Sequence, residues 1–105
     1  LSRWSALLTD EQWADAARAM QRATTLEPDS PDVLLALGWM RRTADRNWRG
    51  AEQAMREALR LRPDHPETLA ALGVLLANLG REEESVLMAR RAAVIARDRA
   101  QGKKS

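Results

Sequence analysis

The chain has 105 residues, of which 45% are hydrophobic and 30% are charged, and its formal net charge is +2. This composition is typical of one folded domain, and a nearly balanced charge without a basic face argues against binding of nucleic acid. The absence of cysteine excludes disulfides and thiolate metal sites, and no apolar run reaches the about 18 residues of a membrane span, so we expect no membrane insertion.

Six helical segments are predicted, and the first is a short one at roughly residues 2–8. The second begins after Thr9, because Thr9 and Gln12 have the spacing of a capping box, in which each side chain satisfies the backbone N–H of the other residue. Pro28 ends it. Between these limits apolar residues recur close to the helical period of 3.6: Trp13, Ala16, Ala17, Met20, Ala23 and Leu26.

The third and fourth helices are predicted over residues 31–43 and 48–61. Ser30 caps the third helix, which starts with a proline where the missing N–H has no partner in any case. Asn47 caps the fourth helix and Pro63 ends it.

The fifth helix is predicted over residues 66–79 and is closed by Gly80, which can adopt the left-handed conformation of a helix end. The sixth opens with three glutamates at 82–84 and closes near Arg97 and Arg99. Acid at the start and base at the end both suit the helix dipole. Residues 101–105 are expected to be a flexible basic tail.

The sequence repeats itself at an offset of 35 positions. Residues 26–38 read LEPDSPDVLLALG and residues 61–73 read LRPDHPETLAALG, and residues 16–28 match residues 51–63 at the same offset. Self-similarity at such a period indicates a solenoid, in which each unit packs on its neighbours. Because short turns join consecutive helices, we expect antiparallel hairpins.

Gly38 and Gly73 fall at the same place in two copies of the repeat, in the middle of a helix. Glycine there costs about 1 kcal/mol relative to alanine. A repeated cost at the same position suggests a repeated reason, which is the close approach of another helix. Ala51 and Ala58 on the following helix are the expected counterparts.

This pattern resembles the tetratricopeptide repeat family. The middle unit supplies Leu34, Leu37, Gly38, Trp48, Ala51, Met55, Ala58 and Pro63; the third supplies Leu69, Leu72, Gly73, Leu76, Gly80 and Ala92; the first supplies Trp13, Ala16, Met20, Ala23 and Pro28. The resemblance implies an all-α fold, a right-handed superhelical stack of antiparallel helix–turn–helix hairpins (an α-solenoid) of about three repeats with the first truncated. It also implies one domain over residues 1–100, with units near 1–28, 31–63 and 66–99.

Four features depart from the family pattern. The turn at residues 43–47 carries one extra residue, and Arg41 stands where a bulky apolar residue is usual. Ser85 and Ala89 replace an alanine and a bulky residue in the third unit, whose closing proline is replaced by an arginine. The leading helix of the first unit is too short for a full match, and Trp4 and Ser5 are the candidate equivalents of its Leu-Gly pair.

In this family the first helices of the repeats line a concave groove that receives a peptide or helix of a partner protein. The same register in this chain gives a candidate groove made of Asp32, Leu35, Ala36, Trp39, Arg42, Ala70, Ala71, Val74 and Asn78. Helical spacing independently places Leu35, Trp39 and Arg42 on one face. The alternative is that Leu35 and Trp39 are core residues covered by a neighbouring repeat.

The resemblance therefore implies a protein-binding module, an adaptor or chaperone-like protein with no cofactor and no enzyme activity. The Lys and Asn clamp of chaperone-tail binders is missing, because Leu35, Trp39, Ala70 and Val74 occupy its positions. An apolar groove is more similar to bacterial-type escorts of hydrophobic segments. The alternative function is a structural scaffold, a homodimer that associates through exposed repeat ends such as Trp4, Leu7 and Leu8.

Other candidate sites are weak. His65 is the only histidine and stands where Ser30 stands in the preceding copy, so it is interpreted as a turn residue or helix cap without nearby partners. The glutamates at 82–84 are interpreted as dipole partners and not as a metal or acid–base cluster. The compartment is left open: the cytoplasm is favoured, although a chain that begins at Leu1 could have lost an upstream signal.

Overall fold

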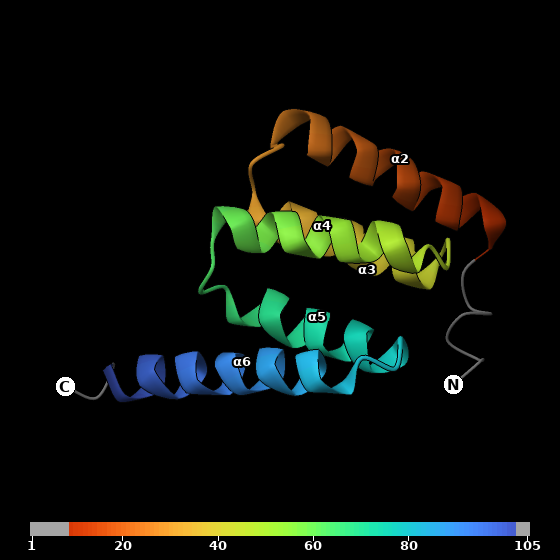
Figure 1. Cartoon of the computed structure of the whole chain (residues 1–105). Helices are drawn as coiled ribbons and strands as arrows, with labels where there is room; N and C mark the ends of the chain where they lie inside the picture. Colours follow the sequence, from red (N-terminus) through yellow and green to blue (C-terminus); the bar gives the residue numbers. More distant parts are fainter. Residues whose placement is uncertain (1–8, 103–105) are drawn as a thin grey trace.

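The computed structural model describes residues 9–102, so the segment predicted at residues 2–8 lies outside the described residues. The described part is all-α, as predicted, and its helices are α2 (Asp10–Leu26), α3 (Pro31–Thr43), α4 (Trp48–Leu61), α5 (Pro66–Asn78) and α6 (Glu82–Gly102). They lie in layers, with α2 at the top of the view, α3 and α4 in the middle, then α5, and α6 at the bottom (Figure 1).

Packing between the helices follows the hairpins that the repeat predicts. The most extensive contacts join α3 to α4 and α5 to α6, which are the two helices of each hairpin. Fewer contacts join one hairpin to the next, through α4 and α5 and through α3 and α5, and α2 rests on α3. The described chain is therefore a short α-solenoid (Figure 1).

The helix ends are set by the local chemistry of their caps. The Thr9 backbone N–H donates to Gln12 Oε1 over 2.8 Å, and the Gln12 N–H donates to Thr9 Oγ1 over 3.1 Å, so the predicted capping box is present. Asn47 Oδ1 accepts from the Gly50 N–H over 2.9 Å. Gly80 has the left-handed φ of +79° that closes the end of α5.

Two helix ends differ from the predicted ones. Helix α5 ends one residue early, at Asn78, and α6 continues to Gly102, so the first two residues of the predicted tail are helical. No proline stops α6, and Arg99 holds its last turns in place, donating to the carbonyl and to the carboxylate of Asp64 over 3.2 and 3.1 Å.

The extra residue of the turn after α3 is accommodated by a left-handed backbone at Arg46, whose φ is 51°. The Asn47 N–H then reaches back to the Arg41 carbonyl over 2.8 Å. The Arg41 side chain, which departs from the apolar pattern of the family, donates to the Gly50 carbonyl over 3.1 Å. This arginine thus closes the α3–α4 hairpin with a hydrogen bond.

The core lies between α4, α5 and their neighbours and not on α2. Its largest cluster comprises Ala51, Met55, Ala71, Leu72, Leu75 and Leu76, and Leu35, Trp39, Leu59 and Met88 pack against it. Helix α2 contributes no buried residue. Burial of apolar surface therefore stabilises the second and third hairpins most.

The repeated glycines mark a close approach of two helices, as predicted. A Cβ added at Gly38 would lie 2.8 Å from Met55 Cγ and 3.2 Å from the Ala51 carbonyl oxygen. A Cβ at Gly73 would lie 3.2 Å from the Ser85 carbonyl oxygen. At Gly38 the counterparts are thus Ala51 and Met55, not Ala58, which packs elsewhere in the buried core.

We expect Gly38→Ala to lower the free energy of unfolding by about 1 kcal/mol or more, because forcing a methyl group against Met55 outweighs the gain in helix propensity. The free energy of unfolding of Gly73→Ala should stay within about 1 kcal/mol of the wild-type value, since the Ser85 carbonyl has to move by only a few tenths of an ångström. Urea unfolding followed by far-UV circular dichroism measures both. A Gly38→Ala protein more stable than the wild type would contradict the close approach.

Candidate functional site

The candidate site is the surface formed by the first helices of two consecutive hairpins, α3 and α5, and is called the α3–α5 face. These two helices contact each other directly. On α5, Ala70, Val74 and Asn78 are exposed and four positions apart, so they form one line along the helix. Val74 is 48% exposed, which is a large fraction for a branched aliphatic side chain.

On α3, the two large apolar residues of the predicted groove are half-buried. Leu35 and Trp39 pack on one side against the core cluster and keep part of their surface accessible, and Ala36 beside them is also half-buried. Both roles considered from the sequence, core residue and surface residue, thus describe these side chains in part.

Ala71 needs a correction. It is 3% exposed and belongs to the core cluster, because it points toward the hairpin interior while Ala70, one position earlier, faces outward. A one-residue step along a helix turns a side chain by about 100°, which is enough to move it from the surface to the core. We therefore leave Ala71 out of the α3–α5 face.

Arg42 closes the C-terminal end of α3 against two indole rings. Its guanidinium carbon lies 5.2 Å from the centre of the Trp39 ring and 5.6 Å from that of Trp48, within the range of cation–π attraction. Its Nε is buried and has no hydrogen-bond partner among residues 9–102. The sequence analysis missed this contact because Trp48 lies beyond an irregular turn, where no helical periodicity relates it to Arg42.

His65 has partners that the sequence analysis did not expect. It is 3% exposed; its Nε2 lies 2.9 Å from Asp32 Oδ1 and 3.4 Å from Glu67 Oε2, and its Nδ1 lies 2.5 Å from Thr68 Oγ1. The predicted place at the start of a helix is correct, although the side chain makes no capping hydrogen bond. His65 thus fixes Asp32, at the start of α3, to the start of α5.

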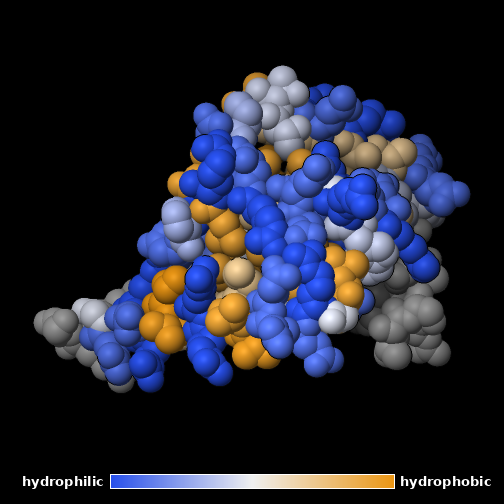
Figure 2. All heavy atoms as spheres, in the orientation of Figure 1, coloured by the Kyte–Doolittle hydropathy of each residue, from blue (hydrophilic) through white to orange (hydrophobic). Residues whose placement is uncertain are grey.

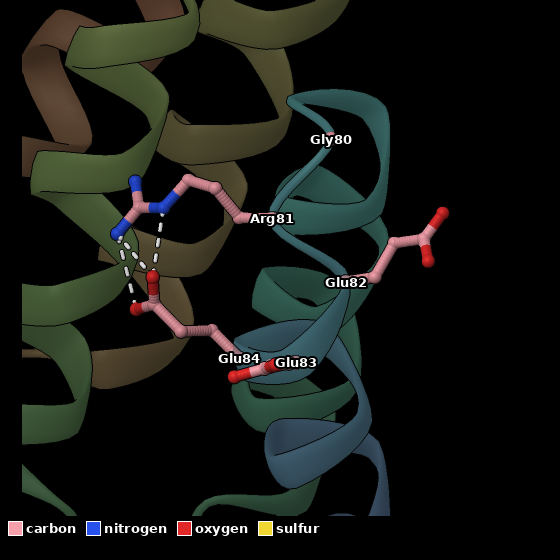
Figure 3. Close-up of a pocket in the computed structure, with 5 residues that line it drawn as sticks. All are labelled: Gly80, Arg81, Glu82, Glu83 and Glu84. Carbon is pink, nitrogen blue, oxygen red and sulfur yellow. Dashed lines mark hydrogen bonds and ion pairs between the residues drawn. The ribbon is translucent and has the colours of Figure 1, made fainter.

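Glu84, the third glutamate at the start of α6, takes part in an ion-pair cluster with α4. Arg81 contacts Glu52 over 2.9 Å and Glu84 over 2.8 Å, and Arg56 contacts the same two carboxylates over 2.8 and 3.2 Å. Arg81 and Glu84 point toward each other on the side of α4, while Glu82 points the opposite way (Figure 3). The hydrogen bond from Arg81 is the main cause that lowers the pKa of Glu84 below its ordinary value.

The α3–α5 face has the properties of a recognition surface. It combines exposed aliphatic groups with half-buried large side chains, and fixed polar groups stand at its ends. No helix within residues 9–102 has both the length and the apolar character to cross a membrane.

The stacked hairpins and this face define an α-helical repeat protein. The profile of the tetratricopeptide repeat family matches residues 4–46 and 42–101, so the chain belongs to this family. The family is generally a protein-interaction fold and not a catalytic one.

Among solved structures, the crystal structure of MamA is similar with a TM-score of 0.74 and 22% sequence identity. The similarity covers 88% of this chain and 53% of that chain, so this chain spans about half the length of its structural neighbour. At this identity the likeness concerns the fold. The comparison with curated proteins finds no match.

We expect Glu84→Gln to lower the melting temperature near pH 7, and the difference from the wild type to shrink as the pH falls. The lowered pKa of Glu84 means that the cluster stabilises the fold above the usual carboxyl range, near pH 4, and that this stabilisation is lost as Glu84 is protonated in acid. Melting curves between pH 7 and pH 3 measure the effect.

Glu83→Gln is the matched control, because Glu83 is exposed at the same helix start and makes no ion pair within the described part of the chain. At pH 7 the melting temperature of Glu83→Gln should lie closer to the wild-type value than that of Glu84→Gln does. A Glu84→Gln difference that persists unchanged at low pH would contradict the role of the cluster.

Proposed function

We propose that the chain is a protein-binding module that receives an apolar helix or extended segment of a partner protein on the α3–α5 face. The observation that carries this proposal is the exposed line of Ala70, Val74 and Asn78 beside the half-buried Leu35 and Trp39. An amphipathic helix laid against such a surface buries its apolar side chains without a deep pocket.

The ends of the face support a defined orientation of the partner. Asp32 stands at the start of α3, close to Glu67 through their shared contact with His65, so this end is acidic. Arg42 stands at the other end of α3, about 15 Å away along the helix, and Asn78 ends α5. A partner segment with a basic group at one end, an apolar middle and an acidic group at the other end fits this arrangement.

The preorganised groups also support binding. His65 holds Asp32 and the two indole rings hold Arg42, so neither side chain loses much conformational entropy when a partner arrives. We infer an adaptor or chaperone-like role, in which the chain binds a hydrophobic segment of another protein and shields it from solvent.

We expect Val74→Glu to abolish enrichment in a selection from a displayed library of helical and extended peptides. A carboxylate in the middle of the apolar line has to be desolvated by any bound segment. Gln53→Glu, a change at an exposed residue of α4, is the control and should keep the wild-type enrichment. Equal enrichment by the wild type and Val74→Glu would remove the α3–α5 face as the binding site.

Trp39→Ala should weaken the binding of a selected peptide by about 2 kcal/mol or more, as the loss of a tryptophan anchor often does. Because Trp39 also packs against the core cluster, this variant loses stability as well, so Val74→Glu is the cleaner measurement.

The second candidate function is a self-associating scaffold, and it is supported by the weak burial of α2, none of whose residues is buried. Sedimentation velocity over a wide concentration range tests it. A dimer that is lost in Leu26→Glu, a change at a residue of α2 that is 73% exposed, would support the scaffold, and a monomer at every concentration would exclude it. The predicted contacts of Trp4, Leu7 and Leu8 lie outside the described residues.

A further inference from the structure

The last helix differs from its counterpart in the preceding hairpin on the side that faces solvent. Gly73 approaches Ser85 and Ala89 as Gly38 approaches Ala51 and Met55, which aligns the two second helices, α4 and α6, residue by residue. In this alignment the outward positions of α4 are occupied by Glu52, Gln53, Arg56, Glu57 and Arg60. The same positions of α6 are occupied by Val86, Leu87, Arg90, Arg91 and Val94, here called the α6 outer face.

The apolar members of the α6 outer face are open to solvent. Val86 is 52% exposed, Leu87 is 50% exposed and Val94 is 43% exposed. Leu87 and Val94, together with both arginines and Ile95, line a shallow hollow of about 320 Å³. Figure 2 shows hydrophobic atoms interleaved with hydrophilic ones along the lower edge of the molecule, where α6 lies.

The arginines of this face differ from those of α4 in their partners. On α4, Arg56 pairs with Glu52 and Glu84, and Arg60 pairs with Glu57. Arg90 and Arg91 make no ion pair or side-chain hydrogen bond within residues 9–102. Two guanidinium groups therefore lie between two apolar residues and make no side-chain hydrogen bond to the described part of the chain.

We propose that the α6 outer face binds an acidic amphipathic helix of a partner protein. Leu87 and Val94 are seven positions apart, about 10 Å along the helix axis, and the two arginines lie between them. A partner helix with apolar residues two turns apart and Glu or Asp between them matches this order. Arginine suits carboxylates because it can donate two parallel hydrogen bonds to one of them.

The charges argue against the two other occupants of an exposed apolar helix. A second copy of the same face, laid antiparallel and centred on the arginines, would bring Arg90 and Arg91 against their own equivalents. A copy shifted to pair Arg91 with Glu83 would place Val94 beyond the start of the other α6, without an apolar partner. An anionic membrane would meet the carboxylates of Glu82 and Glu83, which line the hollow at the N-terminal end of the same stripe with Val86 and Leu87. An acidic helix centred on the arginines pairs both of them, covers Leu87 and Val94, and leaves the glutamates at its edge.

Binding is tested with fluorescein-labelled helical peptides of about 18 residues, roughly five turns. One peptide carries leucines two turns apart with glutamates between them, and in the other lysines replace the glutamates. Fluorescence anisotropy with the full chain should show binding of the glutamate peptide and at least about tenfold weaker binding of the lysine peptide. The double variant Arg90→Glu/Arg91→Glu should reverse this preference.

Two further variants separate the apolar contribution from general effects. Leu87→Ser/Val94→Ser should lose binding of the glutamate peptide by at least about tenfold, while Gln53→Ser, at the α4 position equivalent to Leu87, should bind as the wild type does. All these positions are exposed, and circular dichroism checks that each variant is folded. Val74→Glu, on the α3–α5 face, should leave binding of this peptide unchanged, so this proposal and the proposed function fail separately.

Several results would overturn the proposal. Equal binding of the two peptides would remove the role of the arginines, and loss of binding in Val74→Glu alone would place the peptide on the α3–α5 face. Co-sedimentation with vesicles of phosphatidylserine and phosphatidylcholine, without peptide binding, would make the face a membrane contact. Self-association that Leu87→Ser/Val94→Ser abolishes, again without peptide binding, would make it an interface between copies.

Discussion

The structure depends on the close approach of the two helices within each hairpin. At Gly38 there is no room for a side chain, because an added Cβ would lie 2.8 Å from Met55 Cγ. This approach lets Met55 pass across the hairpin and become fully buried in the cluster that also contains Leu72 and Leu76 of the next unit. One tight contact within a hairpin therefore also supplies the side chain that holds two hairpins together.

The last hairpin keeps the close approach of its two helices, but it has no large buried side chain at the position of Met55. Ala89 stands at the position of Met55 and is exposed, and Ala92 is the one buried residue of α6. Met88 still packs against the core cluster, and polar contacts also hold α6: the Ser85 hydroxyl donates to the Gly73 carbonyl over 2.7 Å, and Arg81 and Arg99 reach carboxylates of earlier segments. A helix held in this way buries little of its surface, which leaves its other side accessible to a partner.

Much of the fold could be predicted from the sequence because it is decided by neighbours in the chain. Thr9, Asn47 and Gly80 end or begin helices through contacts within a few residues, and the predicted bounds of α3 and α4 are correct. Which residues of the candidate site face solvent and which are buried could not be predicted in the same way. Whether Ala70 or Ala71 faces solvent depends on where the α5 neighbours lie, and a helical pattern fixes that direction only to about one residue.

The contacts that the sequence analysis missed join segments far apart in the chain or separated by an irregular turn. His65 meets Asp32 across 33 positions, and Arg42 meets Trp48 across a turn with a left-handed residue. Neither pair has a periodic signature, so only the stacking of the hairpins reveals it. The same stacking decides which exposed residues can act together. The α3–α5 face and the α6 outer face lie on different helices. Because α5 packs closely on α6 at Gly73 and Ser85, this contact sets the distance between the two faces, and a partner on one face leaves the other uncovered.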